Sequence, residues 1–563
     1  MQKTEYVGQI NEKVWFESYP AGVPHEINPD TYSSLSEFFE QKIRLYASEI
    51  AYINLGVQMT YQECEEHSRH FANFLLQHLL LKKGDRIGIM LPNVLQVPVA
   101  IFGVLRAGLV VVNINPLYTP AELQPILRDS GLETILVLSP FAHVIQEVIL
   151  STPIKNIIIT EPMDLFPPMK KILASFYLNT IKRAIPHYSI PNAFSFQKAL
   201  DFGKTVLFRP ISINNNDIAF LQYTGGTTGI PKGAMLTHRN ILANLEQALT
   251  WITPAISEKG EIFITALPLY HIFSLMANLF TPLAIGAKNI LITNPRDTKR
   301  FIGEIAHTHF TMITGVNTLF ASLIHHPDFK KNVDLSSLKL ALAGGMALQK
   351  SVANEWEKIT NKPLLEAYGL SETSPGISMM PVTIKKVIHG TVGLPLPSTE
   401  VEIRNKAKQA LPPNEVGEIW VRGPQVMRGY WQDHVSTSHV LTHDGWFDTG
   451  DIGKMDEAGF LSIVDRKKDT IIISGFNVYP IEIEQVIEKH PDVQEVAVVG
   501  ISGKEGQEII KAYIIRQDIT LTRNEIIEHC KKYLTAYKIP KIIEFVESLP
   551  KSNVGKVLKR KLR

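Results

Sequence analysis

Short apolar runs rich in β-branched residues alternate with longer amphipathic segments over the first two thirds of the chain. Four of these runs are apolar on both faces, which is typical of buried parallel strands, and they cover residues 86–93, 109–115, 133–139 and 155–160. Segments with helical spacing lie between them, such as the stretch over residues 61–81. Repeated strand-then-helix units predict layered α/β sheets with right-handed crossovers.

The pattern changes after about Gly393, where the apolar runs are closer together and turn residues are more frequent. The runs EVEIRN, GEIWVRG and GFLSIVD predict a compact antiparallel sheet or a distorted antiparallel β-barrel. Another unit begins near Lys468 and has the strand and helix content of a small α+β domain. The charged join DRKKD suits an exposed hinge. We therefore expect an α/β protein with a large N-terminal domain over residues 1–467 and a small mobile domain over residues 468–563.

One segment has no acidic residue over residues 165–200. Its apolar residues fall at helical spacing, and the opposite face would carry Lys170, Lys171, Lys182 and Arg183. A basic amphipathic helix over residues 168–185 can lie on an anionic membrane. Most amphipathic helices instead pack the apolar face on their own core, so both interpretations stay open.

Composition and charge narrow the class of protein. Hydrophobic residues make up 45% of the 563 positions and charged residues 20%, which is ordinary for a globular protein. With 57 Lys and Arg against 55 Asp and Glu, the net charge of +2 argues against a dedicated nucleic-acid binder. The two cysteines, Cys64 and Cys530, leave no disulfide framework and favour a reducing compartment. The start of the chain lacks the features of a secretory signal, and the most apolar stretch, residues 97–112, is too short to span a bilayer. We expect a cytoplasmic protein.

A glycine-rich loop is the strongest local signal for chemistry. The sequence YTGGTTGIPKG over residues 223–233 follows the apolar run DIAFLQ. Its glycines let the backbone approach a ligand, while its threonine hydroxyls and Lys232 suit the oxygens of a polyphosphate. Gly233 follows Lys232, so the loop is not a Walker A motif, which needs Ser or Thr there.

This loop resembles the phosphate loop of adenylate-forming enzymes, which include acyl-CoA synthetases, firefly luciferase and the adenylation domains of peptide synthetases. Further segments follow in that superfamily's order: LPLYHIFSL at 267–275, EAYGLSE at 366–372, GWFDTGD at 445–451, DRKKDTIIISGFNVYP at 465–480 and PKSNVGK at 550–556. The stretch over residues 444–469 is also similar to the fatty-acyl-CoA synthetase signature. Sequences such as NPLYTPAEL and GAMLTHRNILANLEQ resemble the bacterial long-chain fatty-acid–CoA ligases from about Val14 onward.

The resemblance implies a two-step reaction. ATP converts a long-chain fatty acid to acyl-AMP and pyrophosphate, and the acyl group then passes to CoA, giving acyl-CoA and AMP. It implies Mg²⁺ as a cofactor and ATP, CoA and a long-chain fatty acid as substrates. It also implies peripheral contact with the inner membrane, and a homodimer is among the assemblies to be considered.

The resemblance also assigns roles to residues. Lys556 would bridge the fatty carboxylate and the α-phosphate, His271 would lie beside the acyl group, and Glu372 would hold Mg²⁺ together with Thr224. Lys468 would be the hinge residue, with a CoA channel near Gly475. The residues expected at the nucleotide are Thr224, Gly225, Gly226, Thr227, Thr228, Gly229, Lys232, Gly344, Glu366, Tyr368, Gly369, Ser371, Asp451 and Arg466.

Two positions depart from the family's pattern. Ser371 stands where the family more often has Thr, although the hydroxyl is kept. One branch of the family has a gating Trp a few residues after the His, whereas this chain has Phe273, Ser274 and Leu275 there. Control of chain length therefore has to be built differently.

Three other interpretations remain open on the sequence. An acyl-AMP ligase would hand the acyl group to a carrier protein, and a luciferase-like oxygenase would need only the adenylate and a suitable pocket. A non-catalytic lipid-binding homologue would have lost Lys556, Glu372 or Asp451, and all three are present. Outside its motif, Lys556 would be read as part of a basic tail, because Lys551, Lys559, Arg560, Lys561 and Arg563 surround it.

Overall fold

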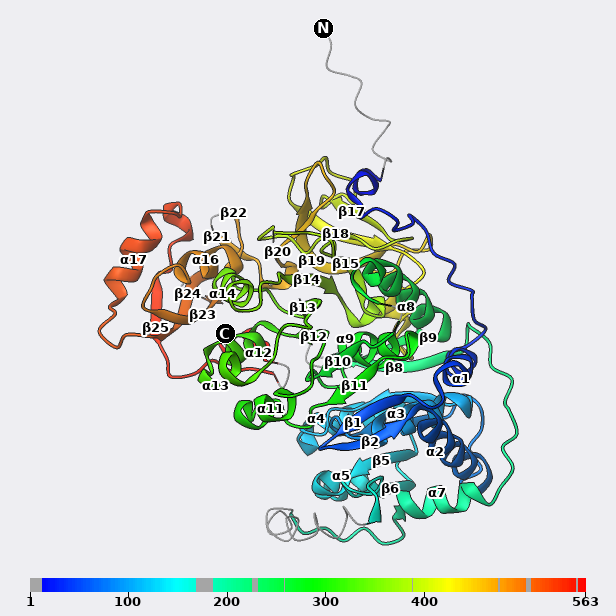
Figure 1. Cartoon of the computed structure of the whole chain (residues 1–563). Helices are drawn as coiled ribbons and strands as arrows, with labels where there is room; N and C mark the ends of the chain where they lie inside the picture. Colours follow the sequence, from blue (N-terminus) through cyan, green and yellow to red (C-terminus); the bar gives the residue numbers. More distant parts are fainter. Residues whose placement is uncertain are drawn as a thin grey trace.

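Two large sheets, a four-stranded antiparallel sheet and a smaller C-terminal part make up the described structure (Figure 1). The computed structural model describes residues 13–168, 186–224, 231–257, 259–386, 388–473, 476–502, 508–552 and 555–563. The basic segment over residues 169–185 and the loop over residues 225–230 lie outside the described residues, as does Gly475. In Figure 1 the blue and cyan sheet lies beside the green one, and the orange and red C-terminal part lies next to α12 and α14.

The first sheet has seven strands in the order β7-β6-β5-β3-β4-β8-β9. Their bounds are β3 Arg86–Met90, β4 Val110–Asn113, β5 Thr134–Leu138, β6 Asn156–Thr160, β7 Phe194–Ser195, β8 Ile218–Thr224 and β9 Lys232–Thr237. All neighbours are parallel except β8 and β9. The four apolar runs predicted as strands are β3 to β6, which confirms that prediction.

The second sheet has nine strands in the order β16-β15-β14-β13-β12-β10-β11-β1-β2. Their bounds are β1 Ile50–Asn54, β2 Val57–Thr60, β10 Ile262–Thr265, β11 Lys288–Leu291, β12 Met312–Gly315, β13 Leu340–Gly344, β14 Leu364–Gly369, β15 Gly376–Met379 and β16 Leu394–Pro395. Strands β12, β13 and β14 are parallel neighbours. Their carboxyl ends therefore meet at one edge, which is where α/β sheets commonly bind ligands.

Helices connect and cover these two sheets. They are α1 Leu35–Tyr46, α2 Tyr61–Asn73, α3 Gln96–Arg106, α4 Pro120–Ser130, α5 Ala142–Val148, α7 Phe196–Lys204, α8 His238–Ile252, α9 Ile272–Ser274, α10 Thr281–Ala284, α11 Thr298–Ile305, α12 Asn317–His325, α13 Pro327–Asn332 and α14 Lys350–Thr360. Helix α4 illustrates how the sequence sets the ends of these helices. Thr119 and Glu122 form a capping box at its start, and Gly131 ends it in the left-handed region. Within the described residues, none of the helices combines the length and apolar character that a membrane span requires.

The antiparallel part predicted after Gly393 is a four-stranded sheet in the order β17-β18-β19-β20. The strands are β17 Glu400–Arg404, β18 Gly417–Arg422, β19 Phe447–Met455 and β20 Leu461–Arg466, with α15 His434–Val440 between β18 and β19. The antiparallel pairing is confirmed. In the described part of the chain β17 and β20 are edge strands of an open sheet, so closure into a barrel stays a prediction.

The small C-terminal domain has its own sheets. The strands are β21 Ile471–Ile473, β22 Phe476–Val478, β23 Val493–Ser502, β24 Glu508–Arg516 and β25 Ile542–Phe545, and the helices are α16 Pro480–Ile487 and α17 Arg523–Lys531. Its buried side chains form a separate cluster, which includes Val498, Ile514 and Ile526. A short helical turn over Lys467–Asp469 joins it to β20, which places Lys468 between the two parts.

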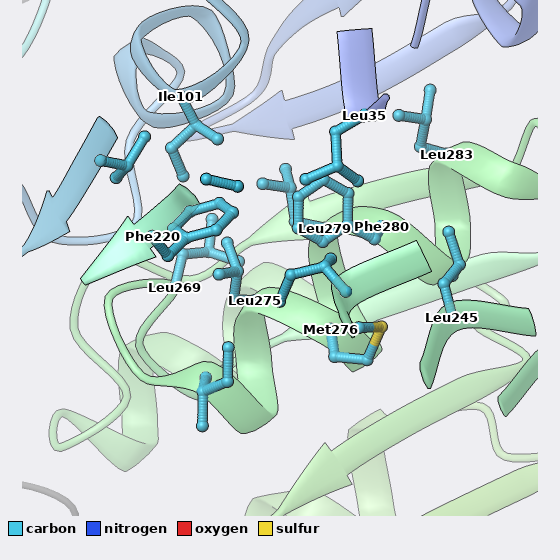
Figure 2. Close-up of a cluster of buried hydrophobic side chains, with 14 of the residues drawn as sticks. Leu35, Ile101, Phe220, Leu245, Leu269, Leu275, Met276, Leu279, Phe280 and Leu283 are labelled. Carbon is cyan, nitrogen blue, oxygen red and sulfur yellow. The ribbon is translucent and has the colours of Figure 1, made fainter. Parts of the chain in front are cut away.

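The largest core contains side chains from both main sheets and from helices α1, α2, α3 and α8. A π-helical segment, Leu275–Phe280, follows α9 directly and contributes Leu275, Met276, Leu279 and Phe280 to this core. Figure 2 shows these four side chains gathered with Ile101 of α3, Phe220 of β8 and Leu245 of α8. The apolar interior therefore begins only a few residues after His271.

Candidate active site

Asp451 and Tyr368 come together from two different sheets. Asp451 lies within β19, and Tyr368 lies near the carboxyl end of β14. The Tyr368 hydroxyl donates a hydrogen bond to Oδ2 of Asp451 at 2.6 Å. Arg466 pairs with Asp451 across β19 and β20, and its Nε lies 2.8 Å from Oδ1. Each oxygen of this carboxylate thus already has one partner.

Burial and charge act against each other on Asp451. Its side chain is only 2% exposed, and this burial raises the pKa of the carboxyl group. The positive charge of Arg466 and the hydrogen bond from Tyr368 lower that pKa again. A buried carboxylate needs such partners to stay ionised, so the arrangement keeps an acceptor group in place.

Glu372 is the second buried carboxyl group of the site. It lies in the helical turn Ser371–Thr373, and burial raises its pKa. The Tyr430 hydroxyl donates to its Oε1 at 2.8 Å, and this hydrogen bond lowers the pKa. Sequence reasoning did not select Tyr430. Its only local signal was an aromatic residue in RGYW, which an ordinary core tyrosine would also give.

Lys232 approaches the same tyrosine from the first sheet. Its ammonium nitrogen lies 5.3 Å from the centre of the Tyr430 ring and donates to Oγ of Ser436 at 2.6 Å. Lys232 opens β9 and pairs in register with Thr224, the last residue of β8. The residues that flank the predicted phosphate loop are therefore held close to the tyrosine that contacts Glu372.

Lys556 reaches this region from the C-terminal domain. Burial and, after it, the positive charge of Arg466 lower the pKa of Lys556 to about 8, while Asp451 counteracts them. Lys556 in turn lowers the pKa of Asp451 and contributes to lowering that of His271. Lys556 as a whole residue is nevertheless exposed to solvent.

A tight turn carries Lys556 to the large domain. Gly555 has φ +83°, and a Cβ there would lie 2.7 Å from Oγ1 of Thr318 at the start of α12. Both the backbone conformation and the close approach require glycine. The Lys556 N–H also donates to Oγ of Ser552 at 3.1 Å, which closes the turn.

His271 caps the short helix α9 and lies next to the apolar core. Its Nδ1 accepts a hydrogen bond from the Phe273 N–H at 3.3 Å. Burial, together with the charge of Lys556, lowers the pKa of His271 to about 4, so the ring is neutral at neutral pH with its proton on Nε2. A Cβ at Gly344 would lie 3.1 Å from the Phe273 ring, which places Phe273 over the end of β13.

The remaining expected residues lie along β14 and at the join. Burial raises the pKa of Glu366 to about 7. A Cβ at Gly369 would lie 1.9 Å from the Pro375 carbonyl oxygen, so this position admits glycine only. Ser371 begins the turn that holds Glu372, and Lys468 lies exposed in the turn between the domains. The expected loop residues Gly225, Gly226, Thr227, Thr228 and Gly229, and Gly475, lie outside the described residues.

The donors present fit a hard cation shared with a substrate. Among the described residues, no three His, Cys, Asp or Glu side chains gather as a metal site. The Glu372 carboxylate and the Thr224 hydroxyl are oxygen donors of the kind that Mg²⁺ prefers. Since Mg²⁺ usually keeps several waters and takes other ligands from substrate phosphates, one or two protein oxygens are enough.

Comparison with known proteins identifies the family to which the chain belongs. The AMP-binding enzyme profile matches residues 39–431, and the profile of the AMP-binding enzyme C-terminal domain matches residues 482–556. The chain belongs to the AMP-binding enzyme family. The matched ranges contain Glu372 and His271 in the first case and Lys556 in the second.

Relatives of this AMP-binding enzyme are similar over almost their whole length. The long-chain-fatty-acid–CoA ligase of Yersinia pestis is 50% identical over 552 residues, which is 98% of each chain. That of Haemophilus influenzae is 46% identical over 554 residues, again 98% of each chain. The crystal structure of ATP-bound MatB from Rhodopseudomonas palustris superposes with a TM-score of 0.81 at 27% identity, covering 94% of this chain and 98% of that one. The fold of two domains with mixed α/β sheets is therefore that of adenylate-forming enzymes.

Proposed function

We propose that this AMP-binding enzyme is a long-chain fatty-acid–CoA ligase of the AMP-forming type. The placement of Lys556 carries the proposal, because this residue of the small domain shares its electrostatic surroundings with Asp451, Arg466 and His271 of the large one. The near full-length likeness to bacterial ligases of that name supports the choice of substrate. The reaction would take part in fatty-acid uptake, and its product, acyl-CoA, would enter β-oxidation.

In the first step an oxygen of the fatty carboxylate attacks the α-phosphorus of ATP. The bond from the α-phosphorus to the bridging oxygen breaks, and pyrophosphate leaves with that electron pair. Both reactants are anions, so the site has to supply positive charge where they meet. Lys556 and Arg466 supply it, and with a pKa of about 8 Lys556 is mostly protonated at neutral pH. Asp451 accepts hydrogen bonds from the ribose hydroxyls, and Tyr368 lies against the adenine.

In the second step the CoA thiolate attacks the acyl carbonyl carbon, and AMP leaves. We propose that the neutral imidazole of His271 lies beside the bound acyl carbonyl, where its Nε2–H would donate to the carbonyl oxygen as charge develops there. We propose that the chain divides into domains at residues 467 and 468. Rotation about Lys468 would then withdraw Lys556 and bring a CoA channel near Gly475 to the acyl-AMP, as domain motions do in other multi-step enzymes.

We further propose that Glu372 and Thr224 hold Mg²⁺ at the ATP phosphates. The bound cation would neutralise charge on the phosphate oxygens. The residues proposed at the phosphates are Thr224, Gly225, Gly226, Thr227, Thr228, Gly229 and Lys232, and those at the nucleoside are Gly344, Glu366, Tyr368, Gly369, Ser371, Asp451 and Arg466.

The apolar core that begins beside His271 would suit a long acyl chain. Burying a C16 chain at about 0.8 kcal/mol per CH₂ gives on the order of 10 kcal/mol before the costs of binding. Such substrates arrive from a membrane, and we propose peripheral contact with the cytoplasmic face of the inner membrane through residues 168–185. We keep a homodimer as one assembly to be tested alongside the monomer.

The test is the formation of AMP and thioester from ATP, Mg²⁺, CoA and a panel of C2 to C18 acids. We expect turnover to peak with the long acids and to need CoA. AMP formation without a CoA thioester would replace the proposal with an acyl-AMP ligase that loads a carrier protein. ATP binding without turnover of any acid would replace it with a non-catalytic lipid-binding protein.

A further inference from the structure

A hydrogen bond between two side chains joins the large and the small domain, in addition to the bond that the Ile481 N–H donates to Oδ2 of Asp465 beside the join. Gln349, the residue before α14, donates from Nε2 to Oε1 of Glu488, the residue after α16, at 3.0 Å. Figure 1 shows α16 next to α14. The two residues are 139 positions apart in the sequence, so this contact depends on how the domains are docked.

The large domain holds Gln349 in a fixed orientation. The Gln349 N–H donates to Oδ1 of Asn317 at 3.0 Å, and Nδ2 of Asn317 donates to Oε1 of Gln349 at 3.2 Å. Because the amide oxygen is already an acceptor, the amide nitrogen faces Glu488. Asn317 is the first residue of α12, so this pair ties the start of α12 to the start of α14.

Glu488 depends on this donor. Burial raises the pKa of its carboxyl group to about 7, and the nearby carboxylates of Glu484 and Glu495 add to that rise. The hydrogen bond from Gln349 acts in the opposite direction. Among the described residues, Gln349 provides the only hydrogen bond recorded to the Glu488 side chain.

The same end of α12 touches the turn that carries Lys556. Thr318 follows Asn317 and lies against Gly555, the residue before Lys556. Gln349 and Thr318 are thus neighbouring points on which the small domain rests. A reacting group has to be placed within a fraction of an ångström, so a contact that fixes the docked domain also fixes the Lys556 ammonium.

We propose that the Gln349–Glu488 hydrogen bond, oriented by Asn317, is a latch that holds the small domain in the arrangement for adenylation. This inference rests on the proposed function. Gln349 and Glu488 are then positioning residues for the first half-reaction and have no part in the second, because the second requires the small domain to leave this position. Releasing the latch lowers the rate of adenylation and leaves thioester formation from preformed acyl-AMP intact.

The test measures the two half-reactions separately with the full-length protein. Adenylation is followed by exchange of labelled pyrophosphate into ATP with palmitate, and thioester formation is followed with synthetic palmitoyl-AMP and CoA. We expect Gln349→Ala to lower kcat for exchange by about tenfold, the usual worth of a hydrogen bond to a charged group, with KM for ATP little changed. Thioester formation should keep the wild-type rate or exceed it. Equal loss in both halves, or no loss in either, would overturn the latch.

Further variants distinguish a positioning role of Gln349 and Glu488 from a general loss of structure. Gln485→Ala removes an exposed glutamine of α16 and should change neither half-reaction. Glu488→Ala should reproduce the effect of Gln349→Ala, and the double variant should lose no more than either single one. Glu488→Gln keeps an acceptor oxygen and should retain most of the exchange rate.

A reciprocal pair covers the case in which Gln349→Ala does not fold. Gln349→Glu alone places two carboxyl groups together and should slow exchange, whereas Gln349→Glu with Glu488→Gln restores a donor and an acceptor and should recover it. Failure of this recovery in a folded protein would count against the latch. If the wild-type protein adenylates no acid at all, the proposed function fails instead, so the two failures are distinguishable.

Discussion

Tyr430 links the flank of the phosphate loop to the carboxylate proposed to hold Mg²⁺. Its hydroxyl donates to Glu372 at 2.8 Å, and Lys232 lies over its ring at 5.3 Å. Tyr430→Phe keeps the ring and removes the donor. Burial and the lost hydrogen bond both then favour protonated Glu372, whose pKa rises further above its usual range. We expect the apparent affinity for Mg²⁺ to fall severalfold and the acidic limb of the adenylation pH profile to move to higher pH.

The measurement is the pyrophosphate exchange rate over a Mg²⁺ titration at several pH values. Trp431→Phe is a neighbouring control that leaves the Tyr430 hydroxyl in place. An unchanged Mg²⁺ dependence in Tyr430→Phe would show that the hydroxyl does not position Glu372.

The role proposed for Lys556 predicts that its loss affects adenylation much more than thioester formation. It also predicts that adenylation declines at alkaline pH. Lys556→Ala should nearly abolish adenylation and leave thioester formation from preformed acyl-AMP close to normal. The ammonium form is lost as the pH rises through a pKa of about 8, so adenylation by the wild-type protein should decline above that pH. Lys556→Arg, whose charge persists to higher pH, should lose that alkaline decline in whatever activity it keeps. Equal loss of both half-reactions in Lys556→Ala would contradict the assigned role.

Gly369 should tolerate no side chain. A Cβ there would lie 1.9 Å from the carbonyl oxygen of Pro375, which is backbone and cannot move aside cheaply. We expect Gly369→Ala to lower the free energy of unfolding by about 1–3 kcal/mol. Gly303→Ala in α11 is the matched control, since nothing lies within 4 Å of its added Cβ, and it should be neutral or stabilising by about 0.5–1 kcal/mol. Denaturant unfolding of both variants gives the comparison.

The basic segment predicts binding to anionic vesicles. Reversal of the charges of Lys170, Lys171, Lys182 and Arg183 should weaken co-sedimentation with anionic vesicles and leave binding to neutral ones unchanged. Turnover of a short acid that is soluble in water should stay at the wild-type rate. Unaltered co-sedimentation would remove the membrane part of the proposal.

The sequence predicted the elements far better than the contacts between them. Apolar runs specified β3 to β6 because strands buried on both faces need continuous apolar residues. The sequence motifs assigned Lys556, Asp451 and Arg466 to the same active site. In the structure, the charges of Asp451 and Arg466 both act on the pKa of Lys556.

Two contacts that now matter were not predictable in this way. Tyr430 and Glu372 are 58 positions apart, and Gln349 and Glu488 are 139 apart. No periodicity or local motif encodes such a pair. The motif EAYGLSE pointed to Glu372 but not to Tyr430, and Gln349 and Glu488 each look like an ordinary surface polar residue. Closure of the antiparallel sheet also depends on long-range pairing, which short runs such as EVEIRN do not specify.

In the proposed site, the crowded carboxylate of Asp451 would select for the sugar of the nucleotide. A carboxylate offers about four lone pairs, and Tyr368 and Arg466 engage one on each oxygen. Two acceptor directions remain, which matches the vicinal diol of ribose. A deoxyribonucleotide would leave one of them empty in a group that is only 2% exposed, and buried acceptors without a donor are costly. The enzyme should therefore draw on the ATP pool and discriminate against dATP without any residue dedicated to that task.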